Sequence, residues 1–84
     1  MTNKEILKKQ IIYRATHRGT KEMDILLGNF VKKYIEEFND NELQDLEKLL
    51  FTEDEIIYNW YFKKNYNNNI SNTKVALMLK NFKL

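Results

Sequence analysis

The chain has 84 residues, no cysteine, no proline, two glycines and a formal net charge of +2. This length suffices for one domain with a single core, and it is too short to enclose a dinucleotide-sized cofactor as well. The lack of cysteine excludes disulfides, thiolate chemistry and cysteine-based zinc sites, and apolar runs of five residues or fewer cannot span a membrane.

The first predicted helix covers residues 3–16. Thr2 followed by Glu5 is a capping-box pattern, in which each side chain satisfies a backbone N–H of the first turn. The chain then breaks at Gly19, because glycine tolerates a positive φ that other residues avoid. Either Gly19 or Thr20 is in place to cap the helix that follows.

The second predicted helix has the clearest amphipathic pattern of the chain. Gly28 lies inside this helix but off its apolar stripe. Because a glycine in mid-helix costs up to about 1 kcal/mol relative to alanine, we expect it to allow a close crossing with another helix. The residues of the stripe recur at helical spacing and are Met23, Leu26, Leu27, Phe30, Val31, Tyr34 and Phe38.

Three shorter helices are predicted in the second half of the chain. Capping-box patterns at residues 39–42 and 52–55 begin two of them, an asparagine-rich polar loop covers residues 63–69, and Ser71 is placed to cap the last helix. No segment alternates with period two, so the predicted fold is all-α, a five-helix bundle in a single small domain over residues 1–84. The apolar positions expected to face the core from these three helices are Leu43, Leu46, Leu49, Leu50, Ile56, Ile57, Trp60, Tyr61, Val75, Met78, Leu79 and Phe82.

Charge is distributed unevenly along the chain. Residues 1–21 carry six basic and one acidic residue, residues 22–58 carry three basic and eleven acidic residues, and residues 59–84 carry five basic residues and no acidic one. Two interpretations stay open. Either the segments neutralise each other within the fold, or one charged face steers a charged partner.

No catalytic or metal-binding group can be assembled from the sequence. His17 is the only histidine and Ser71 the only serine, so a nucleophile–base–acid set lacks its parts. The carboxylates also lack the spacing of a calcium-binding loop. We therefore predict no catalytic residue and no metal site, which places the chain among binding proteins.

Nucleic-acid binding is one alternative, because the basic clusters at both ends of the chain are able to neutralise phosphates. The eleven acidic residues of the middle segment oppose it, and no helix-turn-helix pattern is evident. An antitoxin-like helical regulator is a second alternative. A salt-sensitive shift of DNA mobility would favour the first, and co-purification with a single toxin would favour the second.

The most informative segment joins the first two predicted helices and contains Arg18, Gly19 and Glu22 in an Arg-Gly-x-x-Glu pattern. An aromatic-Arg-Ala sequence precedes it, and a run that begins at Asp24 and continues with leucines follows it. Further along, two leucines and an acid precede a tryptophan, at Leu49, Leu50, Asp54 and Trp60. In this arrangement, over residues 8–82, the chain resembles the succinate dehydrogenase assembly factor 2 family, whose members are flavinylation factors.

The resemblance implies a five-helix fold and a defined role. It implies binding to the flavoprotein subunit of succinate dehydrogenase, with the fumarate reductase flavoprotein as a further candidate client, while FAD becomes attached to a histidine of that subunit. The groups that form the bond then belong to the client and the flavin. The chain itself is expected to be an assembly factor or chaperone rather than an enzyme, and to hold no cofactor stably.

The residues that the resemblance assigns to the client contact are Arg18, Gly19 and Glu22, with Arg14, His17 and Asp24 in second rank. Arg18 offers fixed guanidinium donors to a carboxylate, phosphate or carbonyl group, or is a solvated surface residue. Gly19 lets a partner's backbone approach, or forms a helix-start turn, and both can hold. Glu22 contacts the client, caps the second predicted helix, or pairs with Arg18.

Two positions depart from the family pattern. His17 stands where many bacterial members have arginine, and Ile56 stands where the family often has an acid.

The first ten residues resemble neither a secretion signal nor a mitochondrial transit sequence, because they contain an acidic residue and no arginine. We therefore expect a protein of the bacterial cytoplasm. We also expect a monomer, because a helical bundle of this size with apolar stripes can exist as one. Its expected partner is the flavoprotein subunit, with no nucleic acid bound and no membrane insertion.

Overall fold

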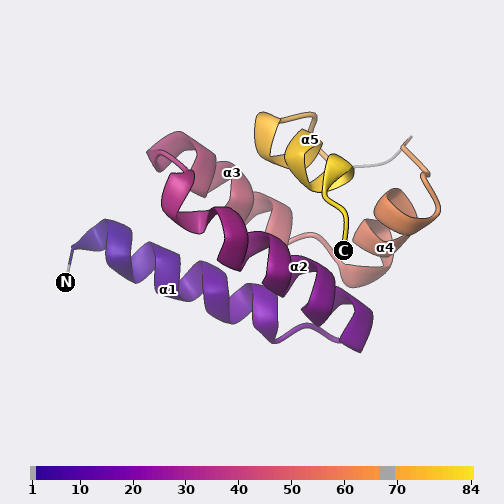
Figure 1. Ribbon diagram of the computed structural model, residues 1–84, viewed down its shortest axis with the longest axis horizontal. Coiled ribbons are helices and arrows are strands. Elements are labelled where there is room, and N and C mark those ends of the chain that lie inside the picture. The colour runs from indigo at the N-terminus through magenta and orange to yellow at the C-terminus, as the bar shows by residue number, and fades with distance from the viewer. Residues whose placement is uncertain (1, 67–69) are drawn as a thin grey trace.

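The structure, a computed structural model, describes residues 2–66 and 70–84 as five α-helices and one short 3₁₀ helix (Figure 1). No strand occurs in these two ranges, so the predicted all-α, five-helix fold is confirmed. None of the described helices is both long and apolar enough to cross a bilayer. The elements are α1 (Asn3–Thr16), α2 (Lys21–Tyr34), the 3₁₀ helix η1 (Ile35–Glu37), α3 (Asp40–Leu50), α4 (Asp54–Phe62) and α5 (Lys74–Asn81).

Helices α1 and α2 form an antiparallel pair (Figure 1). Helix α3 packs on α1 and also on α5. The turn between α1 and α2 lies at the same end of the molecule as the start of α4 (Figure 1). This arrangement brings residues 17–20 next to the loop that joins α3 to α4, although more than thirty residues separate them along the chain.

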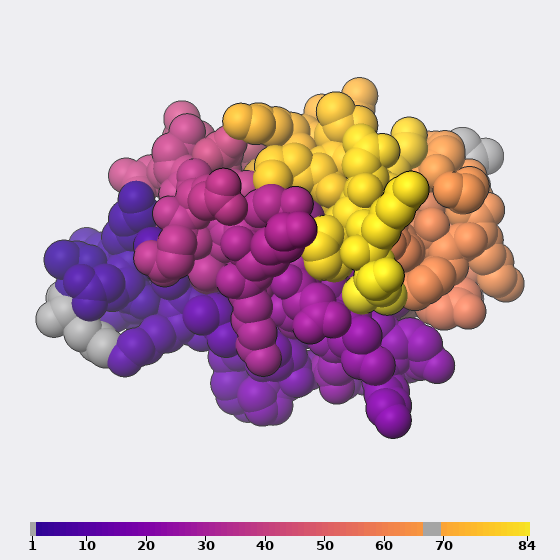
Figure 2. Space-filling view, in the orientation of Figure 1, coloured from indigo at the N-terminus to yellow at the C-terminus, as the bar shows by residue number. Residues whose placement is uncertain are grey.

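The core is built around Phe30 of α2, whose side chain is fully buried. Its ring centroid lies 5.3 Å from that of Tyr34, 6.4 Å from that of Phe38 and 5.4 Å from that of Phe82. The hydroxyl group of Tyr61 donates to the carbonyl oxygen of Phe82, which ties the end of the chain to α4. Figure 2 shows this C-terminal segment (yellow) against the magenta surface around η1 and the orange surface of α4.

The predicted apolar stripe of the second helix is confirmed, since all its members are buried or half-buried. The α-helix itself ends at Tyr34, and the chain continues through η1 to Phe38, which is extended but still buried. Gly28 is buried against α1, where an added Cβ would lie 3.4 Å from Cγ2 of Thr16. The close helix crossing expected at this glycine is therefore confirmed.

The N-caps predicted for the first three α-helices are confirmed, although Thr2 and Glu5 form only one of the two bonds of a capping box. Thr2 accepts from the N–H of Glu5 at 3.2 Å, and Thr20 caps α2. Asn39 and Glu42 form a complete capping box, each accepting from the other's backbone N–H. The Asn39 N–H, followed by the ammonium group of Lys74, lowers the pKa of the Glu42 carboxyl group below its usual value.

The capping box predicted at residues 52–55 is wrong. Helix α4 begins at Asp54, with Glu53 as its N-cap, and no side chain caps it. The reason is a competing contact, because the Asp54 carboxylate and the Thr52 carbonyl are both bonded to the turn between α1 and α2. The loop predicted at residues 63–69 follows α4 as expected, and its residues 67–69 lie outside the described residues.

The cap predicted for the last helix, Ser71, is also wrong. Thr73 directly precedes the first residue of α5, and its hydroxyl oxygen accepts from the N–H of Ala76 at 3.0 Å. Ser71 lies two residues too far upstream to take this position. Apolar packing of Val75 and Leu79 places the start of the helix, and the residue next to that start becomes the cap.

Replacement of Thr73 by alanine is expected to lower the free energy of unfolding by about 1 kcal/mol, because one backbone N–H of α5 loses its acceptor. Ser71→Ala is the matched control, with an expected change within about 0.5 kcal/mol, since Ser71 is exposed. Urea denaturation of both variants measures the difference. Equal destabilisation of the two variants would contradict the assignment of the cap.

The basic ends of the chain pair with its acidic middle. Lys4 lies 3.5 Å from Asp40, and Lys8 lies 3.1 Å from Glu36. At the other end of the chain, the Lys74 ammonium lies 3.1 Å from a carboxylate oxygen of Glu42. The structure therefore supports the first of the two interpretations of the charge pattern, in which the segments neutralise each other.

Candidate functional site

The turn between α1 and α2 is fastened to the α3–α4 loop by the guanidinium group of Arg18. Its Nε donates to Oδ1 of Asp54 at 2.7 Å, Nη1 donates to the Leu50 carbonyl at 2.6 Å, and Nη2 donates to the Thr52 carbonyl at 2.9 Å. Nη2 also lies 2.6 Å from Oδ1 of Asp54, and the Arg18 side chain is only 9% exposed. The donors of Arg18, which the sequence assigned to a partner, are thus directed into the chain itself.

Two carboxylates hold the backbone of the same turn. The N–H of Gly19 donates to Oδ2 of Asp54 at 2.7 Å, so both oxygens of that carboxylate are engaged. The N–H of Arg18 donates to Oδ1 of Asp24, in the first turn of α2. Both acids stand at helix N-termini, where the helix dipole favours a negative charge.

Gly19 does not adopt the positive φ that its position suggested, since no described glycine has one. The residue is exposed, and a Cβ built on it would lie 3.0 Å from Oδ2 of Asp54. Such a separation is tighter than a normal van der Waals contact. The space next to Gly19 is therefore occupied by the carboxylate that binds its N–H group.

Glu22 is the free acid of the site. It is exposed in the first turn of α2, and within the described part of the chain its carboxylate has no hydrogen bond and no ion pair. It neither caps its helix, which Thr20 does, nor pairs with Arg18, which bonds to Asp54 instead. The two structural roles considered for Glu22 from the sequence are thus both wrong. Glu22 therefore presents to solvent, from the first turn of α2, a carboxylate that is unpaired among the described residues.

Two exposed aromatic side chains lie beside the turn, Tyr13 on α1 and Phe51 at the end of α3. The ring of Tyr13 stacks on that of His17, with centroids 4.0 Å apart and 16° between the planes. Nδ1 of His17 lies 2.9 Å from the Tyr13 carbonyl oxygen. The guanidinium carbon of Arg14 lies 4.4 Å from the centroid of the Phe51 ring. Tyr13 is 63% exposed and Phe51 62%, so both rings present apolar surface to solvent beside the turn.

The structure thus brings Arg18, Gly19 and Asp24 into one hydrogen-bonded unit, and leaves the other predicted site residues exposed beside it. Those other residues are Arg14, His17 and Glu22. Sequence reasoning did not assign Tyr13 or Phe51 to the site, and it gave Asp54 no contact. The sequence carries no periodic signal for Phe51, because it lies between the end of one helix and the start of the next. Trp60 is buried, as predicted.

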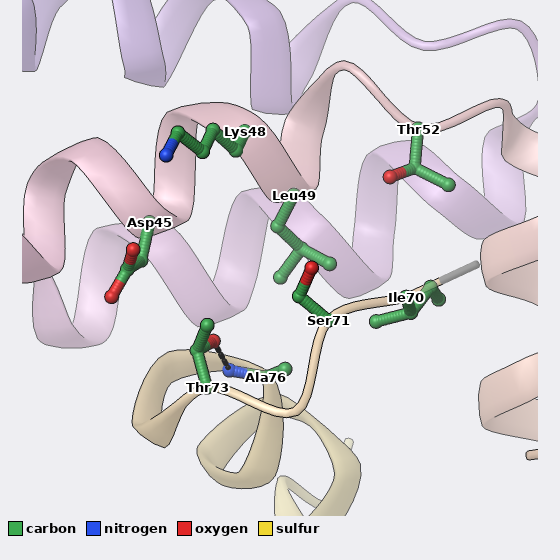
Figure 3. A pocket seen from close by; sticks show the side chains of 8 residues that line it. All are labelled: Asp45, Lys48, Leu49, Thr52, Ile70, Ser71, Thr73 and Ala76. Carbon is green, nitrogen blue, oxygen red and sulfur yellow. Dashed lines mark hydrogen bonds between the residues drawn. The ribbon is translucent and has the colours of Figure 1, made fainter.

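A pocket of about 160 Å³ lies between α3 and the segment that leads into α5 (Figure 3). It is smaller than the cavities that usually hold organic ligands, roughly 300–1,000 Å³. Its connection to the turn is Thr52, whose side chain lines the pocket while its carbonyl accepts from Arg18. No group of three potential metal ligands occurs among residues 2–66 and 70–84. The pocket is lined by Asp45, Lys48, Leu49, Thr52, Ile70, Ser71, Thr73 and Ala76.

Comparison with known proteins gives one consistent result. Residues 9–83 match the family described as the flavinator of succinate dehydrogenase. The chain is 44% identical over 62 residues to a protein of Scheffersomyces stipitis named succinate dehydrogenase assembly factor 2, mitochondrial. Proteins of the same name from Dictyostelium discoideum and Saccharomyces cerevisiae are 38% identical over 60 residues and 39% identical over 64 residues. No solved structure matches the chain significantly.

These alignments cover most of the chain but less than half of each relative. They include 74%, 71% and 74% of this chain, and 41%, 43% and 40% of the relatives from Scheffersomyces stipitis, Dictyostelium discoideum and Saccharomyces cerevisiae. The chain thus spans about two fifths of the length of the curated relatives that it matches.

Proposed function

We propose a function for this chain from one premise: the chain belongs to the family described as the flavinator of succinate dehydrogenase. The chain is an assembly factor that binds the flavoprotein subunit of succinate dehydrogenase and promotes the covalent attachment of FAD to it. The fumarate reductase flavoprotein is a further candidate client. The name shared by the relatives, succinate dehydrogenase assembly factor 2, supports this role.

The observation that carries the proposal is the free carboxylate of Glu22 in the first turn of α2, directly after a turn of the chain that is firmly anchored. Arg18 fixes the turn through three residues at the α3–α4 loop, and two carboxylates hold its backbone. Because the backbone that supports Glu22 is already ordered, docking of a partner has to order only its side chain. Glu22 therefore suits a charge-assisted contact with a basic side chain or with backbone N–H groups of the client.

An assembly factor of this kind acts without a catalytic group of its own. Holding the client so that flavin and histidine meet in a reactive geometry supplies several kcal/mol of the barrier by proximity and orientation. The chain thus needs no catalytic group and holds no cofactor stably, so we infer that it is not an enzyme. Its expected monomeric state rests on the sequence alone. Arg18 supports the client contact through the turn that it anchors, because its own donors are bonded within the chain.

The compartment that we infer from the sequence is the bacterial cytoplasm. The relatives named above carry the word mitochondrial in their names. Nucleic-acid binding and an antitoxin-like role have no specific support from the site. Several of the lysines that would meet phosphates are paired with acids of the same chain.

Reconstitution with purified components tests the proposal. The apo-flavoprotein subunit is incubated with FAD, with and without the chain, and covalent flavin is followed over time by fluorescence of the denatured protein. We expect the rate of attachment to rise severalfold with the chain. If a complex forms but the rate of attachment is the same in both samples, the chain binds the subunit without promoting FAD attachment. Absence of a complex would contradict the proposal as a whole.

Phe51 gives a prediction about the extent of the docking surface. Phe51→Ala is expected to weaken binding to the flavoprotein subunit about tenfold, because exposed aromatic side chains in ordered positions supply much of the energy of an interface. Its stability should stay within about 0.5 kcal/mol of the parent chain, because the ring is 62% exposed. Isothermal titration calorimetry with the purified subunit measures the affinity.

Leu77→Ala on α5 is the matched control, since Leu77 is 50% exposed and belongs to a helix that takes no part in the turn. It should bind as the parent chain does. Equal weakening by the two substitutions would remove Phe51 from the docking surface.

A further inference from the structure

We propose that Asp54 is the positioning residue of this site, and that its carboxylate is what requires a glycine at position 19. The inference rests on the proposed function, because the site matters through the client that it binds. It departs from the idea that Gly19 is needed to let the client's backbone approach. In its place, the requirement is set from inside the chain, by a residue 35 positions away.

The contacts of Asp54 support this role. One carboxylate oxygen accepts from the Arg18 guanidinium, at 2.7 Å from Nε and 2.6 Å from Nη2. The other accepts from the N–H of Gly19 at 2.7 Å. Among residues 2–66 and 70–84, Asp54 is thus the only side chain that holds both the guanidinium group and the backbone of the turn. Its own side chain is 22% exposed and both oxygens are engaged, so it has little to offer the client directly.

The place of Asp54 in the fold explains why it can serve as a fixed point. It is the first residue of α4, where the helix dipole favours its charge. Arg18 also holds the Leu50 and Thr52 carbonyls, on either side of the exposed Phe51. One hydrogen-bonded unit therefore sets where Phe51 stands relative to the turn that leads to Glu22.

The glycine follows from the same geometry. Its φ is not positive, so backbone strain does not require glycine here. A Cβ would lie 3.0 Å from the oxygen that accepts its own N–H, and that carboxylate would have to move. Because the other oxygen is held by Arg18, a shift of the carboxylate disturbs the anchoring of the whole turn. A side chain at this position therefore acts on Glu22 and Phe51 through Asp54.

A double-mutant cycle of Gly19→Ala and Asp54→Ala tests the coupling. The affinity for the purified flavoprotein subunit is measured for the parent chain, each single variant and the double variant. We expect Gly19→Ala to weaken binding about tenfold when Asp54 is present, and less than twofold when Asp54 has been replaced by alanine. The same factor in both backgrounds would overturn the proposal, because it would mean that Gly19 meets the client directly.

A second measurement uses the free chain and needs no client. In ¹⁵N NMR spectra, the Gly19 amide is expected to exchange slowly with water and to resonate downfield, as an N–H bonded to a carboxylate does. Asp54→Asn, a shape-conserving variant, should remove both features while the remaining spectrum stays folded. Asp45→Asn on α3 is the control and should leave the Gly19 amide unchanged. A Gly19 amide that is insensitive to Asp54→Asn would also overturn the proposal.

The two measurements separate this inference from the proposed function. If the parent chain forms no complex with the flavoprotein subunit, the proposed function fails. The coupling between Gly19 and Asp54 is then judged from the NMR spectra and from the same cycle applied to unfolding. In that cycle, Gly19→Ala should raise the unfolding constant severalfold with Asp54 present and hardly at all in the Asp54→Ala background.

Discussion

Replacing Arg18 by alanine is expected to lower the free energy of unfolding by about 3 kcal/mol. The change removes a nearly buried guanidinium group and leaves the Asp54 carboxylate without its ion pair. It also leaves the Leu50 and Thr52 carbonyls without their donor. Breaking a buried ion pair by removing one partner costs about 3–5 kcal/mol. Because the Asp54 side chain is partly exposed, we expect a cost at the lower end of this range. Urea denaturation followed by circular dichroism measures the destabilisation.

A destabilisation of that size is large for a chain of this length, whose total stability is on the order of 4–12 kcal/mol. The free energy of unfolding of Arg18→Lys should lie between those of the parent chain and Arg18→Ala. An ammonium group keeps the charge but lacks the planar guanidinium group that reaches three acceptors. Arg14→Ala is the control, with an expected decrease below about 1 kcal/mol, since Arg14 is an exposed cation over an exposed ring. Unfolding of Arg18→Ala at the same urea concentration as the parent chain would show that the guanidinium network contributes nothing.

Glu22→Ala is expected to have the opposite profile, with an intact fold and much weaker binding to the client. Glu22 is exposed and has no partner within the described part of the chain, so its removal should change the free energy of unfolding by less than about 0.5 kcal/mol. Binding to the flavoprotein subunit should weaken about a hundredfold, because truncation of one partner of an interfacial charge pair costs about 2–5 kcal/mol. Calorimetric titration and urea denaturation of the same preparation separate the two effects.

Glu55 provides a closely matched control. It is an exposed glutamate at the second position of α4, as Glu22 is at the second position of α2. Glu55→Ala therefore removes the same charge from the same place on a helix, and it should bind the subunit as the parent chain does. If both substitutions weakened binding equally, the effect would come from net charge and not from a contact at Glu22.

Much of the fold is predictable because its signals are local. Thr20 and Asn39 each precede a strongly amphipathic segment, so the cap and the apolar stripe indicate the same helix start. At α1, which buries only Ile11 and Ala15, the cap at Thr2 is the main local signal. The two failures occurred where these signals compete. Ser71 and Thr73 are both capping residues, and the packing of α5 decides between them. At residues 52–55 the local pattern favours a capping box, but a contact from a distant segment determines how the loop is held.

The site was predictable in its residues but not in its internal contacts. The pattern of Arg18, Gly19 and Glu22 and the presence of Asp54 are visible in the sequence. However, the partner of Arg18 lies 36 positions further along the chain, and no periodicity reports a contact at that separation. The sequence therefore predicts a partner contact or a solvated surface position for Arg18, whereas its guanidinium group bonds within the chain. Phe51 was missed because an isolated aromatic residue in a loop has no pattern to indicate whether it is buried.

The most direct test of the proposed function is the amount of covalent flavin on the succinate dehydrogenase flavoprotein in cells of the source organism. It is measured as in-gel fluorescence after denaturation, in cells with the gene, without it, and with Glu22→Ala or Glu55→Ala in its place. We expect the fluorescent band to disappear in the deletion and with Glu22→Ala, and to stay normal with Glu55→Ala. An undiminished band in the deletion would contradict the proposal that this chain promotes attachment of FAD.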